Sequence, residues 1–502
     1  MLVKKKIFES FFDKYSMDKN SLNSNYGIEI LIKELGVLKN NYWEEINREI
    51  KIYEKNNPPS HKDNDKEKKK IWKKYYNYET EVDSDIQRLH EVLVIEKAKK
   101  IQFPIYLPHY YDFRGRIYPR SPIGFVFVKS IRSFFVIDSK IDYKSLEKSI
   151  YFKKILEVSK NIEFPKNFNI RNDYDIYFLT ILFLDLGQFK RKELIKPESG
   201  VKPSEFINKG IEVYKNKENS SLSVEDYSKY LSILNCLNTF ELTEDWENIL
   251  INRDSTASSM QHWATILVPK DGVLEKLNLS GDPFYDLYTI AINLFLNKKK
   301  KYIINEKIYP FLKRKYLKKV IMTTNYNSTI WACHKYFKES LKDELYLNEN
   351  LGLWNLIENI HKFLNHDLFS EIFELDKDRF LKEIGEKNQY CFKNNDTDID
   401  LKYYKSKIEK EVIKFDHKRW KFDLHVLTGE IDYKKSGKAL PANIIQSLDA
   451  ALAGYLVKNL KCWSVHDNFG TSLYEVHLLM DLTNDFFNEK LKKESYSLFI
   501  LT

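Results

Sequence analysis

The sequence predicts a mixed α/β fold in which helices predominate. Two short segments, residues 249–251 and 461–465, have the apolar or alternating pattern of strands, and each leads into an aspartate at a turn. Much of the remaining chain has apolar residues at helical spacing. With 43% hydrophobic and 30% charged residues in a chain of 502, the composition is that of a folded globular protein, and it excludes wholesale disorder.

Charge and cysteine content narrow the kinds of protein that this chain could be. Lys and Arg outnumber Asp and Glu by 81 to 72, a net charge of +9 that permits a polyanionic partner but is too diffuse to identify one. The four cysteines form no CxxC pair and no zinc-like spacing, which is typical of reduced thiols in a protein that is not secreted. The longest apolar run, residues 176–184, is too short to cross a bilayer, so we expect no membrane association.

The N-terminal part predicts helices followed by an extended, turn-rich segment. Residues 1–100 look helical and lysine-rich, and the charged run at 61–74 is typical of a solvated face. Residues 101–122 alternate extended pieces with Pro and Gly turns. Residues 123–250 mix short apolar runs with helical stretches.

The C-terminal half predicts helices around one loop and one strand. Residues 255–428 read as mainly helical, with a helix starting at Pro310. Residues 428–443 have the turn residues of a hairpin or a long loop. Apolar residues at helical spacing then predict a helix from about residue 442, ahead of the strand at 461–465.

The first functional candidate is Asp254, at the end of the first expected strand. A lone aspartate at such a place is usually a helix cap, and Ser255 and Thr256 could cap equally well. Considered by itself, Asp254 therefore predicts only the start of a helix.

The second candidate is Asp467, which follows His466 in a tight turn that we expect Gly470 to close. Turn aspartates are common, so Asp467 by itself is also uninformative. Two aspartates at strand ends, however, can meet on neighbouring strands of one sheet. Facing carboxylates repel unless a cation lies between them, and this is how paired Mg²⁺ ions are held in phosphoryl-transfer sites.

The third candidate is a basic helix between these two aspartates. After Pro310, the residues Arg314, Lys318, Met322 and Tyr326 follow at intervals of four and so form a slowly turning stripe about 18 Å long. Such a stripe could lie along a nucleoside triphosphate, with the two cations at the phosphates. An amphipathic helix whose basic residues reach the solvent explains the same pattern if the helix is considered alone.

The order of these pieces resembles that of a known family. Asp254 with STASSMQH, then the helix of Arg314 and Lys318, then HDNFG at 466–470 resemble motifs A, B and C of the phage and mitochondrial single-subunit RNA polymerases. DFRGRIY at 112–118 resembles that family's DxRGRxY element, upstream of motif A. Each motif alone is weak to moderate, and the four in order form a strong signal.

The resemblance implies a right-hand polymerase fold with palm, fingers and thumb, lacking most of the N-terminal promoter-binding domain. Residues 1–104 would supply the thumb and an N-terminal remnant, and 105–280 the first part of the palm. Residues 281–440 would form helical fingers, and 441–502 the rest of the palm. The implied activity is DNA-directed RNA synthesis.

The resemblance also implies roles for the charged motif residues. Asp254 and Asp467 would ligate two Mg²⁺ ions, with the backbone carbonyl of Ser255 as a further ligand. Arg314 and Lys318 would bind the incoming triphosphate, and Lys318 would also protonate or screen the departing pyrophosphate.

Five further residues receive roles in the same way. Tyr326 would select ribose over deoxyribose, and Tyr288 resembles a fingers residue near the nucleotide. Arg114 and Arg116 would contact the template and the hybrid. His466 would position the primer end.

The chain departs from the family pattern at several positions. Ser255 and Asn327 replace glycines, and Asn tolerates positive φ better than most residues, so the turn can survive. Gln446 stands where the family offers a His near the 2′-OH. We expect ribose selection to be weakened rather than lost, because the Gln446 amide can still donate or accept a hydrogen bond at the 2′-OH.

The resemblance implies a DNA template, nascent RNA and ribonucleoside triphosphates as partners. The short N-terminal region further predicts either an accessory initiation factor or a start at DNA ends or melted sites, and we expect a monomer. The compact form and the Lys-, Asn- and Ile-rich composition resemble polymerases encoded by linear plasmids in mitochondria, which predicts a mitochondrial location without a transit peptide.

Two alternatives remain open at this point. A family A-like DNA polymerase shares the spacing of the basic helix, although it would have His-Asp-Glu where this chain has His466, Asp467 and Asn468. A decayed polymerase that binds nucleic acid without catalysis is the other alternative, since two family glycines are lost. All the charged catalytic positions are nevertheless present.

Overall fold

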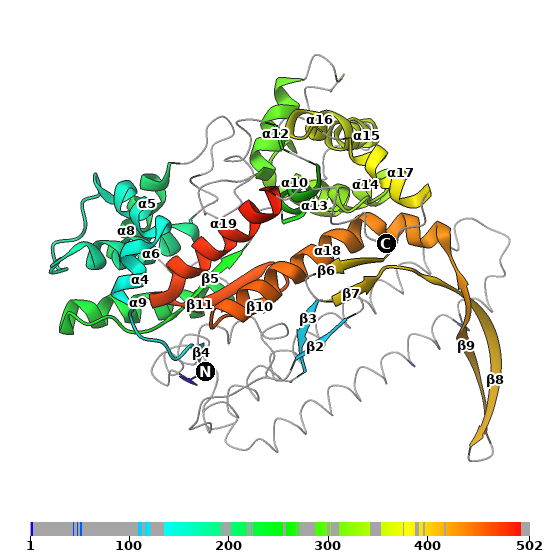
Figure 1. Cartoon of the computed structure of the whole chain (residues 1–502), viewed down its shortest axis with the longest axis horizontal. Helices are drawn as coiled ribbons and strands as arrows, with labels where there is room; N and C mark the ends of the chain where they lie inside the picture. The colour runs from blue at the N-terminus through cyan, green and yellow to red at the C-terminus, as the bar shows by residue number, and fades with distance from the viewer. Residues whose placement is uncertain are drawn as a thin grey trace. The chain divides into compact units, whose positions relative to one another are not determined.

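The fold comes from a computed structural model of the chain, shown in Figure 1. The residues that it describes are 2–3, 44, 48, 51–52, 109–112, 116–120, 135–190, 194, 202–217, 222, 224–254, 258–267, 269–270, 287–298, 302, 311–341, 353–374, 376–386, 391–394, 397–415 and 418–492.

The chain divides into two compact units. The first comprises Met1–Pro108, Pro119–Asp138 and Asn219–Thr239, and the second comprises the remaining three segments. In the first unit, β1 (Leu2–Val3) pairs antiparallel with β4 (Phe135–Val136). Most of the predicted helical region 1–100 lies outside the described residues. Of those that are described there, 44, 48, 51 and 52 are helical and 2–3 form a strand.

A three-stranded antiparallel sheet lies at the centre of the motifs in the second unit. Its order is β10 (Trp463–Val465), β11 (Asn468–Ser472), β5 (Leu250–Asp254). Both predicted strands are therefore confirmed, although the first begins at Leu250 and extends to Asp254 itself. The strand after the Asp467 turn, β11, is the one that joins them.

The prediction that Gly470 closes this turn is wrong. Gly470 lies inside β11 opposite Trp463, and an added Cβ would come 2.0 Å from Trp463 Nε1 and 2.6 Å from Asn252 Oδ1. Glycine is needed here because the indole packs directly on the strand backbone. The turn itself is made by His466, whose φ is +58°.

The described residues between 143 and 243 are mostly helical, as the sequence indicated for part of this region. The helices are α4 (Tyr143–Lys148), α5 (Ile150–Ser159), α6 (Asp173–Gln188), α8 (Pro203–Asn216) and α9 (Val224–Thr243). Helices α6 and α8 cross through Gly187 and Gly210, where an added Cβ would approach the opposite backbone to 2.0 and 1.8 Å. This close crossing buries α6, which reaches the sheet through an ion pair between Asp185 and Arg253 of β5.

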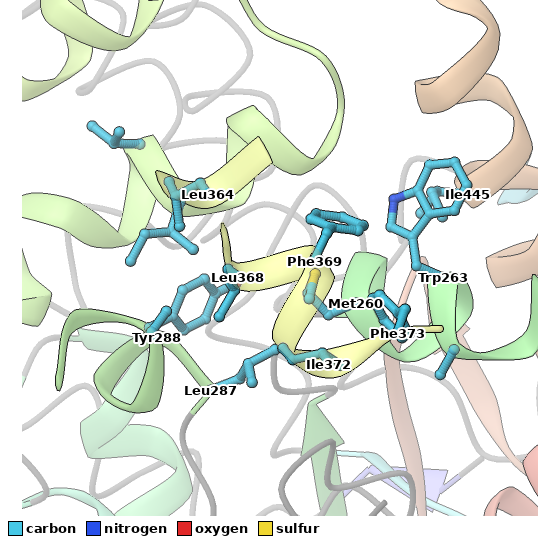
Figure 2. Close-up of a cluster of buried hydrophobic side chains, with 14 of the residues drawn as sticks. Met260, Trp263, Leu287, Tyr288, Leu364, Leu368, Phe369, Ile372, Phe373 and Ile445 are labelled. Carbon is cyan, nitrogen blue, oxygen red and sulfur yellow. The ribbon is translucent and has the colours of Figure 1, made fainter. Parts of the chain in front are cut away.

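A second helical group carries the basic helix. It consists of α10 (Ser258–Leu267), α12 (Leu287–Asn297), α13 (Arg314–Asn325), α14 (Ile330–Ser340), α15 (Leu353–Lys362), the π-helix η3 (Phe363–Asp367), α16 (Leu368–Ile372) and α17 (Lys377–Glu386). These helices share one hydrophobic cluster, part of which Figure 2 shows around Met260, Trp263 and Phe369. All ten residues of α10 are buried, so this helix has no solvent face.

The prediction that the chain is mainly helical up to residue 428 fails after α17. Two hairpins follow, β6 (Cys391–Asn394) with β7 (Thr397–Asp400), and the long ribbon β8 (Tyr404–Phe415) with β9 (Lys418–Ile431) (Figure 1). The β-branched and aromatic residues between 408 and 426 favour strands, and the many lysines and glutamates around them hid that preference.

The long helix α18 (Tyr433–Asn459) also begins earlier than predicted. Residues 433–443 are helical and not part of a hairpin or loop, because the Asp432 side chain caps the helix by accepting from the Lys435 N–H. The helix continues through Pro441, although proline lacks the N–H that an interior position normally donates. After the sheet, η4 (Leu473–Glu475) leads into α19 (Val476–Lys492). Among the described helices, none is long and apolar enough to cross a membrane.

Candidate active site

The structure brings Asp254 and Asp467 to adjacent positions at one end of the central sheet. Asp254 is the last residue of β5 and lies opposite Asn468, the first residue of β11. Asp467 immediately precedes Asn468 in the turn from β10. Two residues far apart in the sequence are therefore neighbours through strand pairing alone.

The electrostatics of Asp467 reflect this crowding. Burial, the charge of Asp254 and the charge of Asp449 together raise the pKa of Asp467 to about 7, although a hydrogen bond with Ser258 opposes the rise. Like charges that share a poorly solvated site disfavour ionisation. A divalent cation between the carboxylates would relieve the same repulsion, so the pair has the character of an ion-binding site.

A third carboxylate, Asp449 of α18, completes this acidic group. Its Oδ2 accepts from the Arg116 guanidinium at 2.8 Å, and its Oδ1 lies 2.8 Å from Nε2 of His262. Both Asp449 and His262 are almost fully buried, with side chains 2% and 1% exposed. Asp449 thus ties α18 to α10 and to the start of β3 (Ile117–Pro119).

Tyr326 faces the same acidic group. Burial and the charges of Asp449 and Asp467 raise the pKa of the Tyr326 phenol well above its ordinary value, while Ser258 and Arg116 oppose that rise. The Ser258 side chain hydrogen-bonds both Tyr326 and Asp467. The phenol therefore stays neutral, close to the two aspartates, with its O–H available for hydrogen bonding.

The end of α13 explains how Tyr326 is held. The Asn327 N–H donates to the Thr324 carbonyl at 2.9 Å and the Ser328 N–H to the Thr323 carbonyl at 3.1 Å, which is a Schellman ending. Asn327 has a φ of +66°, so the prediction that asparagine supports this turn is confirmed. Tyr326 is consequently the C-cap residue and lies just outside the helix.

The start of α13 gathers the predicted triphosphate residues. The Arg314 guanidinium carbon and the Lys318 Nζ lie 5.4 and 5.5 Å from the centre of the buried Tyr288 ring, within the range of cation–π attraction. Lys318 is exposed and Arg314 is half-buried. The helix begins at Arg314 after an N-cap at Lys313, so the predicted start at Pro310 is wrong, and Pro310 itself lies outside the described residues.

The remaining predicted residues have different outcomes. His466 is half-buried, and its ring meets the edge of Tyr118 at 5.4 Å between centroids. Gln446 is half-buried on α18 three residues before Asp449, and therefore on the same helical face. Arg114 and Ser255 lie outside the described residues.

The donor set fits magnesium. Two carboxylates are hard oxygen ligands, and Mg²⁺ is commonly bound through one or two carboxylates with substrate phosphates and water completing the shell. Within the described residues, no three His, Cys, Asp or Glu side chains are grouped as a metal cage.

Sequence reasoning missed Asp449, His262 and Ser258. Asp449 occurs within an otherwise apolar helical stretch, and its spacing of three from Gln446 is the only signal that could have pointed to it. His262 and Ser258 belong to the quoted STASSMQH segment, yet the pattern gives no sign that they face the second aspartate.

Comparisons with known proteins agree with these motifs. Residues 230–390 match the family model of DNA-dependent RNA polymerase. The chain is 25% identical over 443 residues to a probable DNA-directed RNA polymerase of Gelasinospora sp. (strain G114), covering 80% of this chain and 49% of the relative. It is 24% identical over 335 residues to a probable DNA-directed RNA polymerase of Podospora anserina, covering 55% of this chain and 34% of the relative.

This chain spans about half the length of the Gelasinospora relative. The matched region 230–390 contains Asp254 and the whole of α13, and the longer alignment covers most of the chain. The resemblance to the phage-type single-subunit DNA-directed RNA polymerases, which four short motifs predicted, is thereby confirmed.

Proposed function

We propose that this protein is a DNA-directed RNA polymerase that transfers ribonucleotides to an RNA 3′-OH on a DNA template. The observation that carries the proposal is the meeting of Asp254 and Asp467 at one sheet end, with Tyr326 at the end of α13 facing them. The same helix carries Arg314 and Lys318 at its other end. The named relatives support the same activity.

Asp254 and Asp467 would hold the catalytic magnesium. Bound there, Mg²⁺ would lower the pKa of the attacking hydroxyl and stabilise charge on the phosphoryl group and the leaving pyrophosphate. Burial, and then the charge of Asp254, raise the pKa of Asp467 in the free protein. Asp467 would therefore release a proton when a cation is bound, and this contribution makes ion binding weaker at low pH.

The remaining residues would orient the nucleotide. Arg314 and Lys318 would place positive charge along the triphosphate, with Tyr288 beneath both of them. The neutral Tyr326 phenol would lie at the sugar, between the nucleotide and the aspartates. In-line attack on the α-phosphate then depends on positioning and charge stabilisation, which supply most of the catalysis in such reactions.

The buried Arg116–Asp449–His262 group would support this arrangement from behind. Asp449 adds negative charge near Asp467 and Tyr326, and Arg116 offsets it. We propose that the group fixes Arg116 and the start of β3 against α10 and α18, so that Arg116 acts on the template chiefly through its position beside the aspartates.

The proposal also covers the domain assignment, the oligomeric state and the cellular location. Residues 105–280 and 441–502 would form the palm, with the central sheet supported by both parts. Residues 281–440 would form the fingers and 1–104 the thumb. A monomer encoded by a mitochondrial plasmid, with an accessory initiation factor, completes the proposed biology.

Primer extension on a DNA template tests the activity. The native chain is expected to incorporate ribonucleotides only with Mg²⁺ present, and Asp467→Asn or Asp254→Asn should each abolish incorporation. Asp378→Asn is the matched control, because Asp378 is exposed on α17. Incorporation of deoxynucleotides alone would favour a DNA polymerase, and template binding without synthesis would favour a decayed enzyme.

A further inference from the structure

The turn that follows Tyr326 has a hydrogen-bond partner on a different helix. The backbone carbonyl of Ser328 accepts from Nε2 of His361, near the end of α15, at 2.9 Å. Ser328 is the residue that completes the Schellman ending of α13. His361 therefore anchors the backbone of the turn two residues beyond Tyr326, while the Ser328 hydroxyl lies 3.0 Å from Cys333 Sγ of α14.

His361 is itself oriented by an asparagine in an unusual helical turn. The π-helix η3 follows α15, and Asn365 lies within it. The Asn365 amide nitrogen lies 3.1 Å from the His361 carbonyl oxygen, 3.2 Å from Nδ1 and 3.3 Å from Nε2 of the His361 ring. Because the Ser328 carbonyl can only accept, Nε2 carries the proton, and Nδ1 is the ring nitrogen that can accept from the Asn365 amide. Single π-turns of this kind are rare and frequent at functional sites.

The chain of contacts ends at a buried lysine. Lys377 Nζ donates to Oδ1 of Asn365 at 2.8 Å and lies 4.5 Å from the centre of the Phe369 ring. The residue is only 2% exposed, and burial lowers the pKa of Lys377 to about 8. A buried ammonium is costly unless it is well bonded, and this one fixes the orientation of the Asn365 amide because only the amide oxygen can accept from it.

We propose that His361, Asn365 and Lys377 form a positioning relay that holds the turn after α13 and so sets where the Tyr326 phenol lies. The proposal rests on the proposed function, in which Tyr326 faces the sugar of the incoming nucleotide. His361 touches no substrate in this account and acts through the Ser328 carbonyl. The relay would therefore affect nucleotide binding and ribose selection more than the chemical step.

The expected effect follows from the loss of one hydrogen bond. Losing the net free-energy contribution of one neutral hydrogen bond shifts an equilibrium constant by roughly 2- to 13-fold. His361→Leu should therefore raise KM for ribonucleotides by about that factor and lower the preference for ribonucleotides over deoxynucleotides. His361→Gln, whose amide nitrogen can donate to the Ser328 carbonyl, should restore most of both values.

His366→Leu is the matched control, since His366 occupies the same π-helix with a side chain that is 58% exposed. It should leave KM and selectivity at native values. If His361→Leu changes thermal stability but neither KM nor the ribonucleotide preference, the residue is merely structural and the proposal is overturned.

Hydrogen exchange separates this inference from the proposed polymerase activity. Peptides covering residues 323–333 should exchange faster in His361→Leu than in the native chain, His361→Gln or His366→Leu. Unchanged exchange in His361→Leu would overturn the relay even in a fully active polymerase. A native chain without any nucleotide incorporation would refute the activity and with it the selectivity role, whereas the exchange result would still decide whether the relay holds the turn.

Discussion

Replacing Gly470 by alanine should destabilise β11, the strand that begins beside Asp467. The added Cβ would come 2.0 Å from Nε1 and 2.2 Å from Cε2 of Trp463, distances that no van der Waals contact allows. Trp463 is buried, and both of these atoms belong to its rigid ring, so the strand or the indole has to move. Overpacking of this kind costs about 1–3 kcal/mol, and we expect a loss near the upper end, about 3 kcal/mol.

Urea unfolding followed by circular dichroism measures this loss. Gly454→Ala is the matched control, because an added Cβ there meets nothing within 4 Å and Gly454 lies inside α18. Alanine is favoured over glycine in a helix by about 1 kcal/mol, so the two identical substitutions should change stability in opposite directions.

A double-mutant cycle identifies the cause. Trp463→Leu removes the ring that the Gly470→Ala methyl group would clash with. The double variant should therefore lose clearly less unfolding free energy than the sum of the two single variants' losses. Strict additivity, or a Gly470→Ala variant as stable as the native chain, would refute the packing of β11 on Trp463. Since β11 begins beside Asp467, we also expect Gly470→Ala to impair primer extension.

Three other changes test separate parts of the account. The pKa of His477 is lowered to about 4 by burial, against the opposing charge of Asp142, so the unfolded state binds more protons between pH 4 and 6.5. Stability should therefore fall by about 3 kcal/mol as pH drops through that window, and His477→Gln should flatten the dependence in pH-resolved urea unfolding; an unchanged slope would contradict the assignment. Asp449→Asn should lower the unfolding free energy by about 3 kcal/mol, because it leaves the Arg116 guanidinium without its carboxylate partner, and calorimetry showing native stability would exclude that role. Lys318→Ala should raise KM for ribonucleotides at least about tenfold, the effect of one lost charge-assisted hydrogen bond, in steady-state assays where Lys319→Ala, its exposed neighbour, changes little; equal effects of the two would refute a specific phosphate contact.

The central sheet and its two aspartates were predictable because their signal is local. Each strand carries its own pattern and ends in its own acidic residue, and pairing then needs only one further strand, β11. The Asn327 turn was predictable for the same reason, since the conformational tolerance of asparagine is a property of a single residue.

Asp449 could not be predicted, because its role depends on residues remote from it in sequence. Its partner Arg116 is 333 positions away, and α18 has the composition of a buried helix. The β8–β9 ribbon was missed for a different reason: its many lysines and glutamates masked the β-branched and aromatic residues that favour strands. In α18, Pro441 resembles a helix breaker, although the Asp432 cap and tertiary packing favour a continuous helix.

Divalent-ion binding tests the central claim most directly. Mn²⁺ is a paramagnetic substitute for Mg²⁺ at oxygen-ligand sites, so its binding can be followed by electron paramagnetic resonance in the presence of a ribonucleoside triphosphate. We expect Asp254→Asn and Asp467→Asn each to weaken the same Mn²⁺ site strongly, while Asp378→Asn leaves it unchanged. Native Mn²⁺ affinity in either active-site variant would contradict a shared ion between the two aspartates.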